Sequence, residues 1–79
     1  MQRLDEFTTL RLARLKLGRT LQETALLTNI SASKLSAAER RLLRLTAAER
    51  RVVADSLDAP PSQLFDCEGW AALLAIPNS

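Results

Sequence analysis

The side chains best suited to chemistry in this sequence are basic residues gathered near its centre. Between Ala32 and Arg51 there are six basic and two acidic residues, a net charge of +4. From Asp55 onward the only charged residues are four carboxylates, a net charge of −4. Guanidinium groups donate forked hydrogen bonds that suit phosphate, so this asymmetry indicates one face that meets phosphate. The alternative is a solvated helix face.

The sequence offers little to a catalytic or metal centre. It has no histidine and no tyrosine, and Cys67 is its only cysteine. A cysteine nucleophile needs a neighbouring base, and a zinc site needs several nitrogen, sulfur or oxygen ligands. We therefore expect no enzymatic activity, no metal and no cofactor. One cysteine forms no internal disulfide, and no apolar run is long enough for a membrane span or signal peptide, which predicts a cytoplasmic protein.

The elements that must position the basic residues are short helices. Glycine and proline are scarce and fall where helices should stop, and aliphatic residues recur at spacings of three and four. Thr20 with Glu23, and Thr46 with Glu49, form the capping-box pattern of a helix start. We predict helices over residues 4–17, 21–28, 32–41 and 47–57, and a further short turn or helix at 62–65. The expected fold class is all-α, a compact four- to five-helix bundle.

The helices predicted at 20–28 and 31–41, joined by Asn29-Ile30, resemble the helix-turn-helix of the phage-repressor family, which is also called Cro-like or XRE. The resemblance covers about residues 10–65 and rests on many positions at the right spacing. The matching residues are Arg14, Gly18, Thr20, Glu23, Ala25, Leu27-Thr28-Asn29-Ile30-Ser31, Ser33, Leu35-Ser36, Glu39-Arg40, Thr46, Val53-Ala54 and Leu57. The resemblance implies double-stranded DNA as partner, with the second helix of the pair lying in the major groove.

The same resemblance assigns roles to particular side chains. It implies a buried ion pair between Arg14 and Glu39, which would tie the first helix to the recognition helix. The residues expected to read bases, or to lie close to them, are Ala32, Ser33, Lys34, Ser36 and Ala37. Those expected to contact phosphate are Gln22, Ser31, Arg40, Arg41 and Arg44. Serine can bond base edges, and an alanine methyl can contact the methyl of thymine.

Some positions depart from the family pattern. Leu21 stands where a phosphate-binding glutamine is usual, so Gln22 is expected to substitute for it. Arg41 replaces the glycine that normally follows the recognition helix, which predicts a longer helix. The family pattern buries Leu10 and Leu17.

Leucine is in surplus at positions that are usually polar, which indicates a covered surface. We divide the chain into a helix-turn-helix domain at 1–66 and an apolar C-terminal tail at 67–79. This tail is expected to be helical or to pack at a dimer interface, and it could fold back over its own domain or pack against a second copy; its stretch 70–76 is apolar on nearly every side. The residues expected at that interface are Leu57, Leu64, Phe65, Trp70, Leu73 and Leu74. Two-fold dimers that read paired half-sites are usual for such domains.

These observations favour a DNA-binding transcriptional repressor, such as an autoregulator of a phage, plasmid or other mobile element. With no second domain for an effector, the simplest mechanism is occlusion of a promoter by a bound dimer. The rival interpretation is an antitoxin-like module that uses the same fold to bind another protein. Small side chains on the recognition helix and the surplus of leucine favour this rival.

Overall fold

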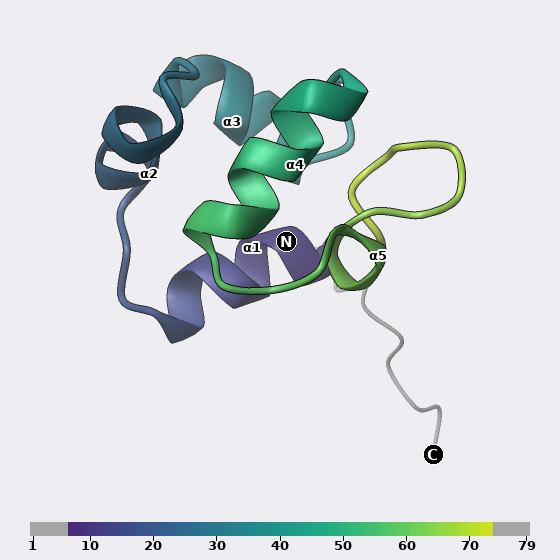
Figure 1. The fold of residues 1–79 in the computed structure, drawn as a ribbon, viewed down its shortest axis with the longest axis horizontal. Helices are drawn as coiled ribbons and strands as arrows, with labels where there is room; N and C mark the ends of the chain where they lie inside the picture. Colours follow the sequence, from purple (N-terminus) through teal and green to yellow (C-terminus); the bar gives the residue numbers. More distant parts are fainter. Residues whose placement is uncertain (1–6, 74–79) are drawn as a thin grey trace, which may run out of the picture.

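Within the described part of the chain, five short helices follow one another (Figure 1). The computed structural model describes residues 7–73. The helices are α1 (Thr9–Lys16), α2 (Leu21–Thr28), α3 (Ala32–Glu39), α4 (Ala47–Ser56) and α5 (Pro61–Leu64). Within the described range there is no β-strand, only two isolated bridges, so the all-α prediction is confirmed. No helix between residues 7 and 73 is long and apolar enough to cross a membrane.

Side-chain caps set the starts of α2 and α4. Thr20 Oγ1 accepts a hydrogen bond from the backbone N–H of Glu23 at 3.0 Å, and Glu23 Oε1 accepts from the N–H of Thr20 at 2.9 Å. Thr46 and Glu49 repeat this exchange at 3.1 and 2.9 Å. Each pair satisfies two backbone N–H groups that have no partner inside the helix. Both predicted capping boxes are confirmed.

Two helix ends differ from the sequence prediction. Thr8 is the N-cap of α1, so the helix does not include Phe7 and Thr8; residues 4–6 of the predicted helix lie outside the described range. α3 ends at Glu39, and the predicted extension to Arg41 is wrong. Arg41 has a φ of 59°, which is left-handed, and so takes the conformation that the family's glycine would supply.

The core lies where the helices pack on one another. α2 packs against α3 and α4, while α5 packs against α1 and α4. The buried apolar side chains are Leu10, Ile30, Leu35, Ala38, Leu45, Val53, Ala54, Leu57, Leu64, Phe65 and Ala71. Leu10 is buried as expected, but Leu17 is 46% exposed because it lies at the C-cap of α1, so its expected burial is wrong.

After α5 the chain turns back onto the helices through a segment that we call the C-terminal loop, residues 65–71 (yellow-green in Figure 1). Phe65 and Ala71 form one antiparallel bridge across its base, and Leu73 pairs with Thr8 in a second. Residues 67–73 are therefore not helical, so the helical alternative for the tail does not hold in this part; Leu74 and the residues after it lie outside the described range. Ala71 belongs to the same core as the helices.

Candidate nucleic-acid interface

α3 has one buried side and one side of small residues. Leu35 and Ala38 are buried beneath it, and Ile30 in the preceding turn is buried as well. Ser31 Oγ caps the helix by accepting from the backbone N–H of Lys34 at 3.2 Å. The remaining small residues predicted to face DNA are exposed or half-buried: Ser31, Ala32, Ser33, Ser36 and Ala37. Such short side chains allow another surface to approach the helix backbone closely.

The orientation of α3 depends on a buried ion pair with α1. Arg14 Nε donates to Glu39 Oε2 at 2.6 Å and Arg14 Nη2 donates to Glu39 Oε1 at 3.2 Å. The side chains of Arg14 and Glu39 are only 10% and 7% exposed. Arg14 Nη1 also donates to the carbonyl oxygen of Arg19 at 2.7 Å, and Thr8 Oγ1 donates to the carbonyl of Glu39 at 2.8 Å. Four hydrogen bonds therefore join these groups across α1, its following loop and α3.

Lys34 lies in an ion pair that the sequence analysis did not foresee. Its Nζ is 2.6 Å from Glu49 Oε2, at the start of α4. The hydrogen bond from Lys34, followed by the backbone N–H of Thr46, holds the pKa of Glu49 below its ordinary value. Glu49 thus caps α4 and binds the one long donor at the front of α3, which links the two helices. A base could be read by Lys34 only in exchange for this contact.

Two of the three arginines predicted to grip phosphate are bound by the C-terminal loop. Arg41 Nη1 lies 3.3 Å from Asp66 Oδ2 and donates to the carbonyl oxygen of Ala71 at 2.7 Å. Arg44 Nη1 donates to the carbonyl of Glu68 at 3.1 Å, and its guanidinium carbon lies 5.8 Å from the centre of the Trp70 ring. Both arginines therefore have partners within the protein.

The third arginine, Arg40, lies near Arg11, a cation that the sequence analysis did not identify. Arg40 is exposed at the end of α3 and lines a small hollow of about 150 Å³ together with Arg11, beside the buried ion pair. The hollow is lined by Arg11, Arg14, Leu21, Ser36, Glu39 and Arg40. Among residues 7–73, Arg40 makes no side-chain hydrogen bond or ion pair. Arg11 lies one helical turn before Arg14, and this spacing was the sequence signal that places Arg11 on the same side of α1.

The two other residues predicted to contact phosphate meet at a second hollow. Gln22 and Ser31 both line a depression of about 380 Å³ beside the turn between α2 and α3. Its remaining wall is mainly apolar and includes Leu26, which is 86% exposed. Gln22 is exposed on α2.

The predicted dimer residues do not form one exposed surface. Leu57, Leu64 and Phe65 are 4%, 2% and 6% exposed and belong to the core of the chain, so little of their own surface is left for a partner. Trp70 is half-buried beside Arg44, and Leu73 is 47% exposed.

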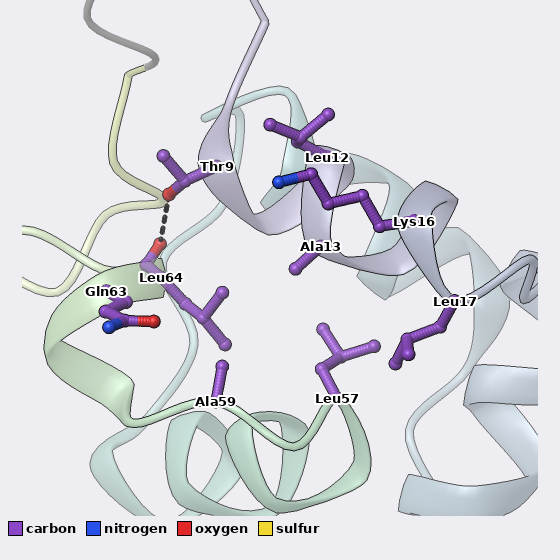
Figure 2. A pocket seen from close by; sticks show the side chains of 9 residues that line it. All are labelled: Thr9, Leu12, Ala13, Lys16, Leu17, Leu57, Ala59, Gln63 and Leu64. Carbon is purple, nitrogen blue, oxygen red and sulfur yellow. Dashed lines mark hydrogen bonds between the residues drawn. The ribbon is translucent and has the colours of Figure 1, made fainter.

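An apolar groove runs between α1, the end of α4 and α5 (Figure 2). It measures about 350 Å³, and the side chains of Leu57 and Leu64 point into it from one side, while Leu17 points toward it from the end of α1. The full lining is Thr9, Leu12, Ala13, Lys16, Leu17, Leu57, Ala59, Gln63 and Leu64. This groove adjoins two of the predicted interface residues, Leu57 and Leu64.

The part of the chain that the structure describes holds no group of three or more histidine, cysteine, aspartate or glutamate side chains that could bind a metal ion. Cys67 is exposed on the C-terminal loop. With this geometry described, the chain was compared with known proteins. No family model, no curated protein and no solved structure matches it.

Proposed function

We propose that this protein binds double-stranded DNA through α3 and represses transcription as a homodimer. The proposal rests mainly on how α3 is held against α1 and on the small side chains of its outer side. A buried, doubly hydrogen-bonded ion pair between Arg14 and Glu39 holds the helix, and its outer side is small enough to enter a major groove. Around its far end lie the cations Arg11 and Arg40, which line one hollow.

Base contacts in this proposal come from the small residues. Ser33 and Ser36 offer hydroxyl groups to base edges, and Ala32 and Ala37 offer methyl groups to thymine. None of these residues distinguishes bases as strongly as a bidentate arginine or glutamine does. We therefore expect part of the specificity to depend on the shape of the DNA, with Lys34 exchanging its bond to Glu49 for a base or phosphate.

Phosphate contacts come first from Arg40 and Arg11, and from Gln22 and Ser31 at the second hollow. The hollow of Arg11 and Arg40 lies beside the end of α3, and the hollow of Gln22 and Ser31 lies beside its start. Contacts with the phosphates on each side of a groove position a protein without reading sequence.

The dimer in this proposal forms through the apolar groove between α1, α4 and α5, with Leu17 exposed at its rim. A two-fold dimer places two copies of α3 on successive turns of DNA, and occlusion of a promoter by such a dimer is the simplest route to repression.

Titration of the protein onto a labelled duplex from the region upstream of its own gene, with an unrelated duplex as control, tests the proposal. At two salt concentrations we expect preferential binding to the first duplex that weakens steeply with salt, because bound cations release counterions from phosphate. Arg40→Ala should weaken binding to both duplexes, whereas Arg51→Ala, at an exposed arginine of α4 that lines neither hollow, should change it little. Equal, feeble binding to both duplexes would contradict the proposal.

A second candidate function is binding to another protein. Leu26, Leu27 and Leu42 are 86%, 60% and 66% exposed and present apolar surface that a partner protein would cover. Substitution of Leu27 and Leu42 by serine discriminates between the two candidates, because neither residue lines a hollow that the first candidate uses for phosphate. Under this second candidate the double variant keeps its fold but loses its partner, while under the first it binds the duplex as the wild type does.

A further inference from the structure

The C-terminal loop is built around one carboxylate. Asp66 Oδ1 accepts from the backbone N–H groups of Glu68 and Trp70, each at 3.0 Å, and this closes the turn. The other oxygen, Oδ2, faces Arg41 at 3.3 Å. Asp66 thus shapes the loop with one oxygen and binds an arginine with the other.

The loop also lies directly against two further arginines. Gly69 is buried and has a φ of 94°, and a Cβ added there would meet the guanidinium of Arg50 and the side chain of Arg44. Trp70 lies beneath the guanidinium of Arg44. The loop therefore covers a cluster of three arginines, which we call the arginine cluster: Arg41, Arg44 and Arg50.

From these contacts we infer that the C-terminal loop is an autoinhibitory latch, in which Asp66 and the loop carbonyl groups occupy donors of the arginine cluster that would otherwise bind DNA phosphate. This inference rests on the function proposed above. A carboxylate and a phosphate are competing acceptors for the same guanidinium, because both offer charged oxygens in a forked geometry.

The part of the latch that opens lies between the bridged core residues Phe65 and Ala71, because the contact of Asp66 with Arg41 is only partly shielded from water. The side chains of Arg41 and Asp66 are 32% and 33% exposed, and Arg44 is exposed. Ion pairs at such positions contribute little to stability, so a row of phosphates can replace the single carboxylate. Release of residues 66–70 would free Arg44 from Glu68 and Arg41 from Asp66, just beyond the end of α3, while Arg41 keeps its bond to the core residue Ala71.

The first test removes the charge of Asp66 and keeps its shape. Asp66→Asn retains one side-chain oxygen for the turn and loses the charged contact with Arg41. Asp55→Asn, at an exposed carboxylate of α4, removes the same charge elsewhere. We expect Asp66→Asn to bind the duplex several-fold more tightly than Asp55→Asn, with a salt dependence steeper by about one counterion, since one more phosphate is neutralised.

The second test opens the latch without a change of charge. Gly69→Ala places a methyl group against Arg50, whereas Gly18→Ala introduces a left-handed alanine at a φ of 67° where nothing lies within 4 Å. Trp70 is the only tryptophan and reports on the loop directly. In Gly69→Ala its emission should shift to longer wavelength without DNA and duplex affinity should rise, whereas Gly18→Ala should show neither change. Circular dichroism verifies that each variant is folded.

The outcomes separate the latch from the proposed function. If the wild type binds DNA and both test variants bind no better than their controls, the latch is wrong while DNA binding stands. If no variant binds any duplex, the proposed function fails and the latch fails with it. Tighter binding by Asp66→Asn or Gly69→Ala than by the matched control supports the latch.

Discussion

Glu39 in α3 receives two hydrogen bonds from the guanidinium of Arg14 in α1, at 2.6 and 3.2 Å. Both side chains are almost fully buried, and the guanidinium of Arg14 donates a further hydrogen bond to the carbonyl oxygen of Arg19. α1 and α3 are separated by α2 in the sequence. The ion pair therefore fixes the orientation of α3 relative to α1, which the turns between them do not fix alone. It links the helix proposed to enter DNA to the helix that lines the proposed dimer groove.

Loss of one partner of this pair should be severe. Glu39→Ala leaves the guanidinium of Arg14 buried without its carboxylate, and we expect the free energy of unfolding to fall by about 3–5 kcal/mol. The double variant Arg14→Met, Glu39→Leu removes both charges and should cost much less. Urea denaturation measures both values. A double variant as unstable as the single one would show that the geometry of the pair, rather than burial of an unpaired charge, dominates.

The left-handed turn between α2 and α3 gives a second prediction. Asn29 has a φ of 60°, a conformation that alanine adopts at a cost of about 1–2 kcal/mol and glycine adopts freely. Asn29→Ala should lower the thermal midpoint, whereas Asn29→Gly should leave it nearly unchanged. Equal losses in the two variants would indicate that the side chain of Asn29, and not its backbone, stabilises the turn.

Acid stability should depend on Glu49. Its pKa in the folded protein lies below the ordinary value of 4.5, first because Lys34 donates a hydrogen bond to it. Its contribution to stability is therefore complete above pH 4.5 and is lost as the pH falls through the lowered folded-state value. Unfolding of Glu49→Gln at a series of pH values should show a flatter decline below pH 4.5 than the wild type. Lys34→Met removes the donor and keeps the Glu49 carboxylate, so it should also flatten the decline, and a decline as steep as that of the wild type would contradict the role of Lys34.

The dimer interface can be tested with two leucines of equal exposure. Leu15 and Leu17 are both 46% exposed near the end of α1, but only Leu17 lines the apolar groove. Leu17→Asp should weaken self-association at least tenfold in analytical ultracentrifugation, because a carboxylate loses water on entering an apolar interface. Leu15→Asp should have little effect. A wild-type protein that is monomeric at all concentrations would rule out the groove as a dimer interface.

The parts of the fold that sequence reasoning predicted are those that depend on neighbouring residues. The capping boxes of Thr20 and Thr46 join residues three apart, and the left-handed Asn29 follows directly after α2. Among contacts between distant segments, the Arg14–Glu39 ion pair was expected only from the family resemblance, and it is present; the others gave no such signal. Nothing near Arg41 in the sequence indicates that it bonds Asp66 and Ala71, and these contacts accompany a left-handed backbone where a longer helix was expected.

The same limit explains why the burial of some expected interface residues was not foreseen. Leu64 and Phe65 are apolar residues near the end of the chain, which suggested an exposed patch, but the bridge between Phe65 and Ala71 brings the chain back over them. Arg11 was overlooked because the family resemblance assigns no role to its position. Only the fold shows that Arg11 and Arg40 line the same hollow.

The most direct test of the central claim is to map the surface that meets DNA by nuclear magnetic resonance. A 79-residue protein gives a resolvable amide spectrum, to which an operator duplex is added stepwise. The account predicts that shifted amides gather at Ser33, Ser36 and Ala37 and extend to Arg11 and Arg40, while those around Leu17 and Gln63 in the groove stay in place. Shifts confined to the groove or to the exposed leucines of α2, or no shifts at all, would contradict DNA recognition by α3.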